Sequence, residues 1–221
     1  FDTGWRPSVG DGSNPNDSND EGWQSSFDAE LPADRTAMSS ALACHADATW
    51  TNNSGDNEER PINCVSWYTA IAFCIWDGGY LPSEAEWNFA AAGGQQRAYP
   101  WSSPPTSLTI AQADANFDCL GDGVAGCPIT DYLRVGTLPG GVGAFGQADL
   151  SGNVWEWVLD YYTATYPMPC VDCVQLTPGP DRSMRGGSFY NQPSTLRQGQ
   201  RVNEVPDIVQ GNNGVRCARP P

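Results

Sequence analysis

The sequence predicts an α+β domain with little regular secondary structure and several disulfides. Its 221 residues include 24 Gly and 18 Pro, which indicate many turns. Eight Cys, an even number, indicate four disulfides rather than free thiols. Apolar residues follow a clear helical period only between residues 66 and 93. We therefore expect two main helices among loops and short strands.

The chain is expected to form a single domain over residues 1–221. It contains no long linker, no heptad run and no internal repeat. Residues 1–59 are irregular and acidic, with one short helix expected within residues 31–44, capped by Asp34 or Thr36. The first residues, FDTGWRP, read as the middle of a polypeptide, which predicts that processing or truncation removed an N-terminal part.

The first main helix is predicted to begin after Ser66, a residue type that caps helix N-termini. Its apolar face consists of Trp67, Ala70, Ile71, Cys74 and Ile75. The second is predicted to begin after Ser83, because Glu86 lies three residues later and completes a capping box. Gly-Gly pairs end both helices. Strands are expected at residues 134–138, 158–162, 185–189 and 214–218.

The charge balance limits the partners that this chain can bind. It has 26 acidic residues against 11 basic ones and a formal net charge of -15, and all of the basic residues are Arg. This balance argues against nucleic acid and anionic membranes. It favours cations or a basic partner, or it reflects the acidic surface of a secreted protein. The sequence contains no apolar run long enough to span a membrane.

Eight Cys also indicate an oxidising compartment, so we expect a secreted, extracellular or cell-surface protein. The one C-x-x-C, at Cys170 and Cys173, has no second pair at zinc-finger spacing, and His45 is the single His. A redox dithiol would precede a helix, whereas this pair lies in a Pro-rich loop. His45 is expected to be a solvated side chain rather than a catalytic base.

Residues 146–157, GQADLSGNVWEW, are the most unusual stretch of the chain. Glycines let the backbone bend and expose its carbonyls, and Asp149, Asn153 and Glu156 add oxygen donors. Such a donor set suits calcium. The alternative is a tight turn whose polar side chains cap its own backbone.

The ordered motifs LPSEAEWNFAAAGG, GQADLSGNVWEW, MRGGSF and GVRCA resemble the formylglycine-generating enzyme (sulfatase-modifying factor) family. The resemblance covers residues 60–221, whereas residues 1–59 carry little of it. It implies a C-type-lectin-like fold with small mixed sheets, many loops and bound calcium. We expect the family's opening strand and helix to be missing, because the resemblance begins about where they would end.

The resemblance implies two calcium sites. The first would use the side chains of Asp149 and Glu156 and the carbonyls of Gly152 and Val154. The second would use Asn116, Phe117 and an Asp of the following loop, either Asp118 or Asp122. Alternatively, a disulfide between the cysteines that bracket this loop would replace the second ion.

The resemblance also implies a disulfide between Cys74 and Cys217. The simplest remaining pairs are Cys44 with Cys64, Cys119 with Cys127, and Cys170 with Cys173.

The family's oxidase chemistry is not expected here. It needs two Cys shortly after the Gly-Gly-Ser-aromatic motif, because copper(I) requires soft thiolates. The corresponding run, residues 186–197, has no Cys, and Tyr190 and Leu196 lie near the expected positions. A three-His iron site, used by a related branch, cannot form from one His. We therefore expect no copper and a non-catalytic role, the alternative being an oxidase that works by other means.

A third branch of the family binds ligands through variable side chains near the C-terminus. The matching segment is polar and predicts a ligand face at Tyr190, Asn191, Gln198, Gln200 and Asn203. The alternative is ordinary loop solvation. We expect a protein or glycan ligand in a bacterial-type secreted domain. A neighbouring chain or a cleaved segment would complete the sheet edge, and a structural unit of a surface filament is a further alternative.

Overall fold

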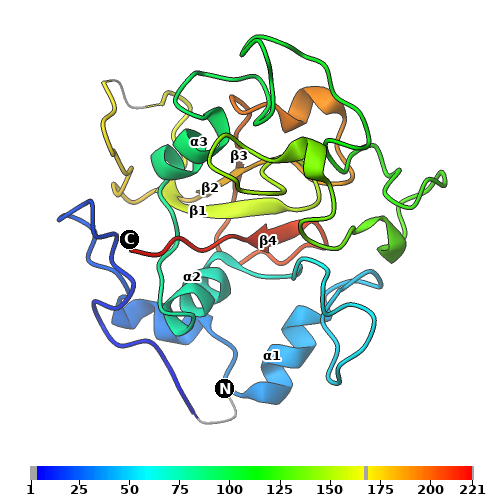
Figure 1. Ribbon diagram of the computed structural model, residues 1–221. Coiled ribbons are helices and arrows are strands. Elements are labelled where there is room, and N and C mark those ends of the chain that lie inside the picture. The colour runs from blue at the N-terminus through cyan, green and yellow to red at the C-terminus, as the bar shows by residue number, and fades with distance from the viewer. Residues whose placement is uncertain (1–3, 167–168, 221) are drawn as a thin grey trace.

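The computed structural model describes residues 4–166 and 169–220, and a small mixed sheet lies at its centre (Figure 1). The strand order is β3-β2-β1-β4. β1 pairs antiparallel with β2 and parallel with β4, while β2 pairs antiparallel with β3. The strands are β1 Trp155–Tyr161, β2 Arg182–Arg185, β3 Val202–Glu204 and β4 Asn213–Val215. The expected α+β class with a small mixed sheet is confirmed.

Short helices surround the sheet. The α-helices of the described residues are α1 Arg35–Leu42, α2 Trp67–Trp76 and α3 Glu84–Ala92. The 3-10 turns are η1 Ser25–Glu30, η2 Ile129–Asp131, η3 Pro139–Gly141 and η4 Pro193–Leu196. No helix among the described residues is long and apolar enough to cross a membrane.

The predicted helix caps are present. The hydroxyl of Ser66 accepts a hydrogen bond from the backbone N–H of Thr69 at 3.1 Å. Ser83 and Glu86 form the predicted capping box, with each residue's backbone N–H bonded to the other's side chain. Gly93 ends α3 at a φ of 61°, a left-handed conformation that glycine adopts without strain. Local sequence therefore determines where these helices begin and end.

Strand β1 separates two cores because its side chains alternate between the faces of the sheet. Trp155, Trp157 and Leu159 belong to a large cluster that includes side chains of α1, α2 and η1. Val158 points the other way and packs with Trp87 of α3. Figure 1 shows α2 on one side of the sheet and α3 on the other.

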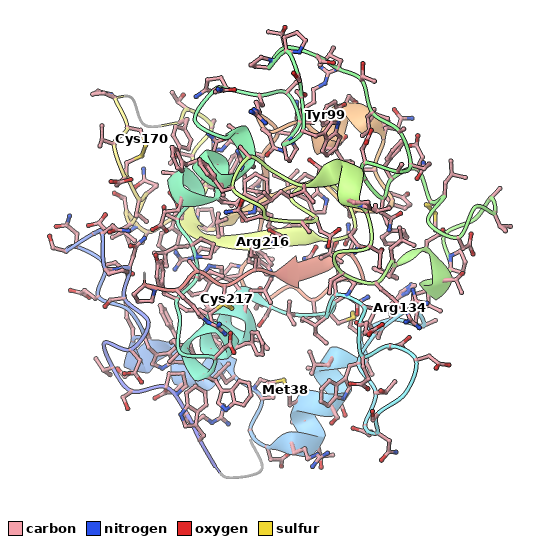
Figure 2. All side chains as sticks on the ribbon, viewed as in Figure 1. Met38, Tyr99, Arg134, Cys170, Arg216 and Cys217 are labelled. Atoms are coloured by element: carbon pink, nitrogen blue, oxygen red, sulfur yellow. A yellow bond between two sulfur atoms is a disulfide. The ribbon has the colours of Figure 1, made fainter. Side chains whose placement is uncertain are left out.

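The structure contains the four disulfides that the sequence analysis expects. The bond between Cys74 and Cys217 joins α2 to the segment after β4 across a separation of 143 residues. The chain-entropy model assigns about 4–5 kcal/mol of stabilisation to a loop of that length. In Figure 2, Arg216 lies beside the central sheet and Cys217 lies toward α2, so successive residues of this segment attach to different layers.

Some strand predictions were wrong. Residues 134–138 form a turn rather than a strand, and Gly136 there has a φ of 73°. The strand expected at residues 185–189 lies earlier, because Gly186 and Gly187 have φ values of 96° and 75° and end it at Arg185. β3 lies within the segment that the sequence analysis interprets as a polar ligand face.

Buried charges connect α3 to the sheet. The carboxylate of Glu84, which is 1% exposed, pairs with the guanidinium groups of Arg185 and Arg201. Asp160 of β1 accepts hydrogen bonds from the backbone N–H groups of Glu84, at 2.6 Å, and Gln175, at 2.9 Å. Asp160 therefore ties the first turn of α3 and the loop before β2 to the central strand.

This arrangement predicts a pH-dependent stability. Burial raises the pKa of Asp160 to about 7, well above its ordinary value. Between pH 4 and pH 7 the folded protein therefore binds more protons at Asp160 than the unfolded chain does. The free energy of unfolding should fall as pH rises through this window, by up to about 1.4 kcal/mol per pH unit from this group.

Urea unfolding of the wild type and of Asp160→Asn at several pH values tests this prediction. The variant should lose that part of the pH slope. Asp172→Asn, a matched change on an exposed loop, should keep the wild-type slope. An unchanged slope in Asp160→Asn would contradict the assignment.

Candidate functional site

The Gly-Gly-Ser-Phe run follows directly after β2 and leads to Tyr190 and Leu196. Tyr190 is 62% exposed, whereas Leu196 is fully buried in a cluster with Tyr99 and Phe117. A Cβ atom on Gly187 would lie 2.9 Å from Leu196, so the turn packs closely against this side chain. The two positions that the sequence analysis compares with the family's reactive cysteines thus hold an exposed ring and a buried apolar group.

No thiol is available for a soft metal in the described structure. All eight Cys of the chain are consumed by the four disulfides, and no free Cys remains. Copper(I) sites depend on thiolate or thioether ligands. The residues present therefore do not fit a copper-thiolate centre.

The five residues predicted as a ligand face do not form one surface. Tyr190, Gln200 and Asn203 are exposed. Asn191 is half-buried, and its side-chain oxygen Oδ1 accepts hydrogen bonds from the backbone N–H and the hydroxyl of Ser188. Gln198 is only 2% exposed, because its side chain donates to Ser151 inside the protein and its backbone carbonyl accepts from an arginine of β2. Gln198 therefore cannot contact a ligand at the surface.

A second group of polar residues lies buried between the 116–133 loop and the turn that precedes β1. Asn116 is 1% exposed and Asp131 is fully buried. The amide of Asn116 donates to the carbonyl of Asp131 and, at 3.0 Å, to the side-chain oxygen of Asn153. The remaining oxygens, Oδ1 of Asn116 and Oδ2 of Asp131, have no hydrogen-bond partner. Two such oxygens in one buried cluster are unusual, because buried polar atoms are normally satisfied.

The candidate ligands from the sequence analysis occupy different places around this cluster. Asp122 uses its carboxylate on Val124 and Thr130, and its backbone N–H donates to a carboxylate oxygen of Asp131 at 3.1 Å. The carbonyl of Phe117 accepts from Leu120. Asp118 is exposed.

Sequence reasoning missed Asp131, although an acid within one turn after the disulfide loop is a usable signal. Its pKa is raised first by burial, with the nearby Asp122 carboxylate as a further cause.

Calcium fits the unpartnered oxygens of this cluster, because it prefers carboxylate and carbonyl oxygens. A Cβ atom on Gly121 would lie 2.9 Å from Oδ1 of Asn116, so the loop approaches these oxygens closely. Among the described residues, no three His, Cys, Asp or Glu side chains gather in a way that could hold a metal. Further ligands here would therefore be amide or backbone oxygens, or water.

At the turn of residues 146–157, the charge of the buried glutamate is already paired with a cation. Arg216 forms an ion pair with Glu156 there. Glu156 is 4% exposed, and both of its oxygens accept hydrogen bonds. Arg216 donates to them at 2.7–3.1 Å, and the indole of Trp87 donates at 2.6 Å. Arg216 also donates to the carbonyl of Ala148 at 2.9 Å. The guanidinium of Arg216 thus connects the carboxylate of Glu156 to the backbone carbonyl of Ala148.

Asp149 is the other acid expected at the first calcium site. Its Oδ2 accepts a hydrogen bond from the backbone N–H of Gly136 at 2.6 Å. Burial raises the pKa of Asp149, the charge of Arg216 opposes this shift, and Glu156 adds to it. With a cation already on Glu156, the side chains at this turn do not form a free carboxylate pair for calcium. The excess of acids over bases favours a structural ion pair for Arg216, and the structure identifies Glu156 as its partner.

Gly152 and Asn153 place the buried cluster next to this turn. A Cβ atom on Gly152 would lie 2.1 Å from the carbonyl oxygen of Asn116, and Gly152 has a φ of 83°, so glycine is required. The backbone N–H of Asn153 donates to that same carbonyl at 3.2 Å. The cluster therefore borders directly on the turn.

The exposed ring of Tyr190 contributes to an open hollow of about 320 Å³. Four chain segments meet there: the loop after α1, the 116–133 loop, the run after β2 and the loop before β4. The side chains that line it include His45, Asp47, Tyr132, Phe189, Tyr190 and Asn212. We call this feature the His45 hollow.

This chain is similar to a known family of proteins. Residues 16–221 match the sulfatase-modifying factor enzyme 1-like domain family. The formylglycine-generating enzyme of Thermomonospora curvata is 33% identical over 182 residues, which cover 75% of this chain and 57% of the relative. The Bos taurus protein named inactive C-alpha-formylglycine-generating enzyme 2 is 33% identical over 177 residues, covering 74% and 52%. The chain spans about half the length of these curated relatives.

Solved structures show the same fold at lower identity. Treponema denticola variable protein 1 is 22% identical, with a TM-score of 0.61, over 84% of this chain and 80% of that one. PvdO from Pseudomonas aeruginosa is 24% identical, with a TM-score of 0.62, over 76% and 64%. Together with the family match, these similarities show that the chain belongs to the sulfatase-modifying factor (formylglycine-generating enzyme) family.

Proposed function

We propose that this protein is a non-oxidising member of its family that acts in binding or assembly. The observation that carries the proposal is the pairing of all eight Cys in disulfides. A family member that oxidises a substrate cysteine through copper(I) needs free thiolates, and Tyr190 and Leu196 cannot replace them. The similarity to relatives named inactive supports this direction.

The proposed binding role rests on the surface around Tyr190. Four loops from distant parts of the sequence meet at the His45 hollow, and loops held on a rigid scaffold commonly carry recognition. Four disulfides hold this scaffold in place. They also support the proposal that the protein works outside the reducing cytosol, as a secreted or cell-surface protein.

We further propose that the protein binds one calcium ion at Asn116 and Asp131. Two buried, unpartnered oxygens support this site, whereas the pairing of Glu156 with Arg216 argues against an ion at the neighbouring turn. Bound calcium would satisfy both oxygens and fix the 116–133 loop against the turn before β1.

The absence of oxidase activity can be measured directly. The protein, loaded with copper(I), is incubated with a sulfatase-type peptide that contains the target cysteine, and the peptide is analysed by mass spectrometry for aldehyde. We expect no aldehyde above background, because no thiolate is available. The Thermomonospora curvata enzyme serves as the positive control. Catalytic aldehyde formation by this protein would overturn the proposal.

Calcium binding is tested by thermal unfolding with calcium and with a chelator. Calcium at about a hundredfold excess over Kd should add about 2.7 kcal/mol to the free energy of unfolding. Asp131→Asn should abolish this gain because it removes the buried carboxylate. Asp118→Asn, an exposed Asp in the same loop, should keep it. Equal gains in both variants would contradict the placement of the ion.

A further inference from the structure

We propose that the His45 hollow binds an organic ammonium ion, a positively charged nitrogen that carries alkyl groups. This inference rests on the proposed binding function and names the ligand class for the same surface. It follows from the rings, the charges and the occupied hydrogen-bonding groups that surround the hollow.

Aromatic rings provide the first argument. Tyr132, Phe189 and Tyr190 all line the hollow. The rings of Tyr132 and Phe189 pack against each other with centroids 4.2 Å apart, and Tyr190 is 62% exposed beside them. The negative face of an aromatic ring attracts cations, and alkylated ammonium ions are recognised in this way by several rings together.

The charge of the hollow has the matching sign. Asp47 contributes a carboxylate, whose Oδ2 lies 3.3 Å from Nδ1 of His45, and no Arg is among the lining residues. Burial, with the charge of Asp47 as a smaller cause, raises the pKa of Tyr132 to about 12, so the carboxylate acts on the ring beside it. A net charge of -15 over the whole chain adds a long-range attraction for cations.

Two hydrogen-bonding groups of the lining are already occupied, which makes a polyhydroxylated ligand less suited to the hollow than a cation. The carbonyl of Gly211 already accepts from the hydroxyl of Tyr132, at 2.5 Å, and from the amide of Asn63, at 2.7 Å. The Nδ1 atom of His45 accepts from the backbone of Asp47. A sugar would need several free donors and acceptors, whereas a cation on aromatic rings needs mainly the carboxylate. The volume of about 320 Å³ lies at the small end of ligand sites and suits a compact cation.

The single His of the chain gives a specific readout, because one imidazole Cε1–H signal reports on the hollow in a proton NMR titration. Choline should shift this signal in a saturable way. Its uncharged analogue 3,3-dimethylbutan-1-ol, of the same shape, should bind at least roughly tenfold more weakly. Equal binding of the two, or no shift of the His45 signal with millimolar choline, would overturn the proposal.

Variants locate the interaction. Asp47→Asn should weaken choline binding by roughly tenfold, and Tyr190→Leu by roughly three- to fivefold. Glu30→Gln removes the same charge on η1, outside the lining, and should leave binding unchanged. Unaltered binding in both hollow variants would count against the site. If Asp47→Asn does not fold, Tyr190→Leu and the comparison of choline with the neutral alcohol still decide the question.

A trimethyl-lysine peptide distinguishes the two sources of such a cation. Tighter binding of the peptide than of choline would indicate a modified protein as ligand, and equal binding would indicate a free small molecule. A negative result with choline does not decide whether the proposed function is right. If choline fails but a glycan shifts the His45 signal, the inference falls while the binding role stands, and only aldehyde formation would remove the non-oxidising assignment.

Discussion

The ion pair between Glu156 and Arg216 is the interaction on which the centre of this structure depends. Glu156 lies on the central strand, and Arg216 lies just after the edge strand that pairs with it. The same glutamate receives the indole of Trp87 from α3, and the same guanidinium bonds the turn at Ala148. This charge pair, buried on the side of Glu156, therefore joins the sheet, a helix and the turn that precedes β1. Removing Arg216 would leave the buried charge of Glu156 uncompensated, which is far more costly than losing an exposed pair.

Buried acids of β1 attach distant segments of the chain to the sheet. Its two Trp and Leu159 build the larger core on one face, while Glu156 and Asp160 on the other face accept donors from distant segments. A chain with few and short regular elements has limited apolar area for holding its loops together. Buried carboxylates, each with several donors, and four disulfides attach those loops at defined points.

Family membership does not by itself determine the chemistry of this protein. The scaffold is shared with formylglycine-generating enzymes, but the positions compared with their reactive cysteines hold an exposed tyrosine and a buried leucine. Leu196 packs into an apolar cluster, and Tyr190 contributes its ring to the hollow. The two positions that the sequence analysis compares with reactive cysteines thus hold one aromatic ring at the His45 hollow and one core residue. Such a change is consistent with the general observation that function lies in sites carried by a fold, not in the fold itself.

Local features of the fold could be predicted from the sequence. Ser66, Ser83 and Glu86 cap their helices as expected, because capping depends on residues only three positions apart. The strand boundaries were less predictable. Gly186 and Gly187 end β2 through their positive φ angles, and β3 lies in a polar segment where only pairing with β2 makes a strand.

The sequence by itself determined the class of fold, through its composition and its resemblance to a known family. It also determined the helix caps and the lack of a cysteine pair after the Gly-Gly-Ser-Phe run, since these depend on residue types at short spacing. Only the tertiary structure decided that Arg216 reaches Glu156, that Asp131 lies against Asn116, that Gln198 is buried, and that His45 and Tyr190 share a hollow. These pairs lie between 15 and 145 residues apart. No local pattern encodes such contacts, because the packing of whole elements brings them together.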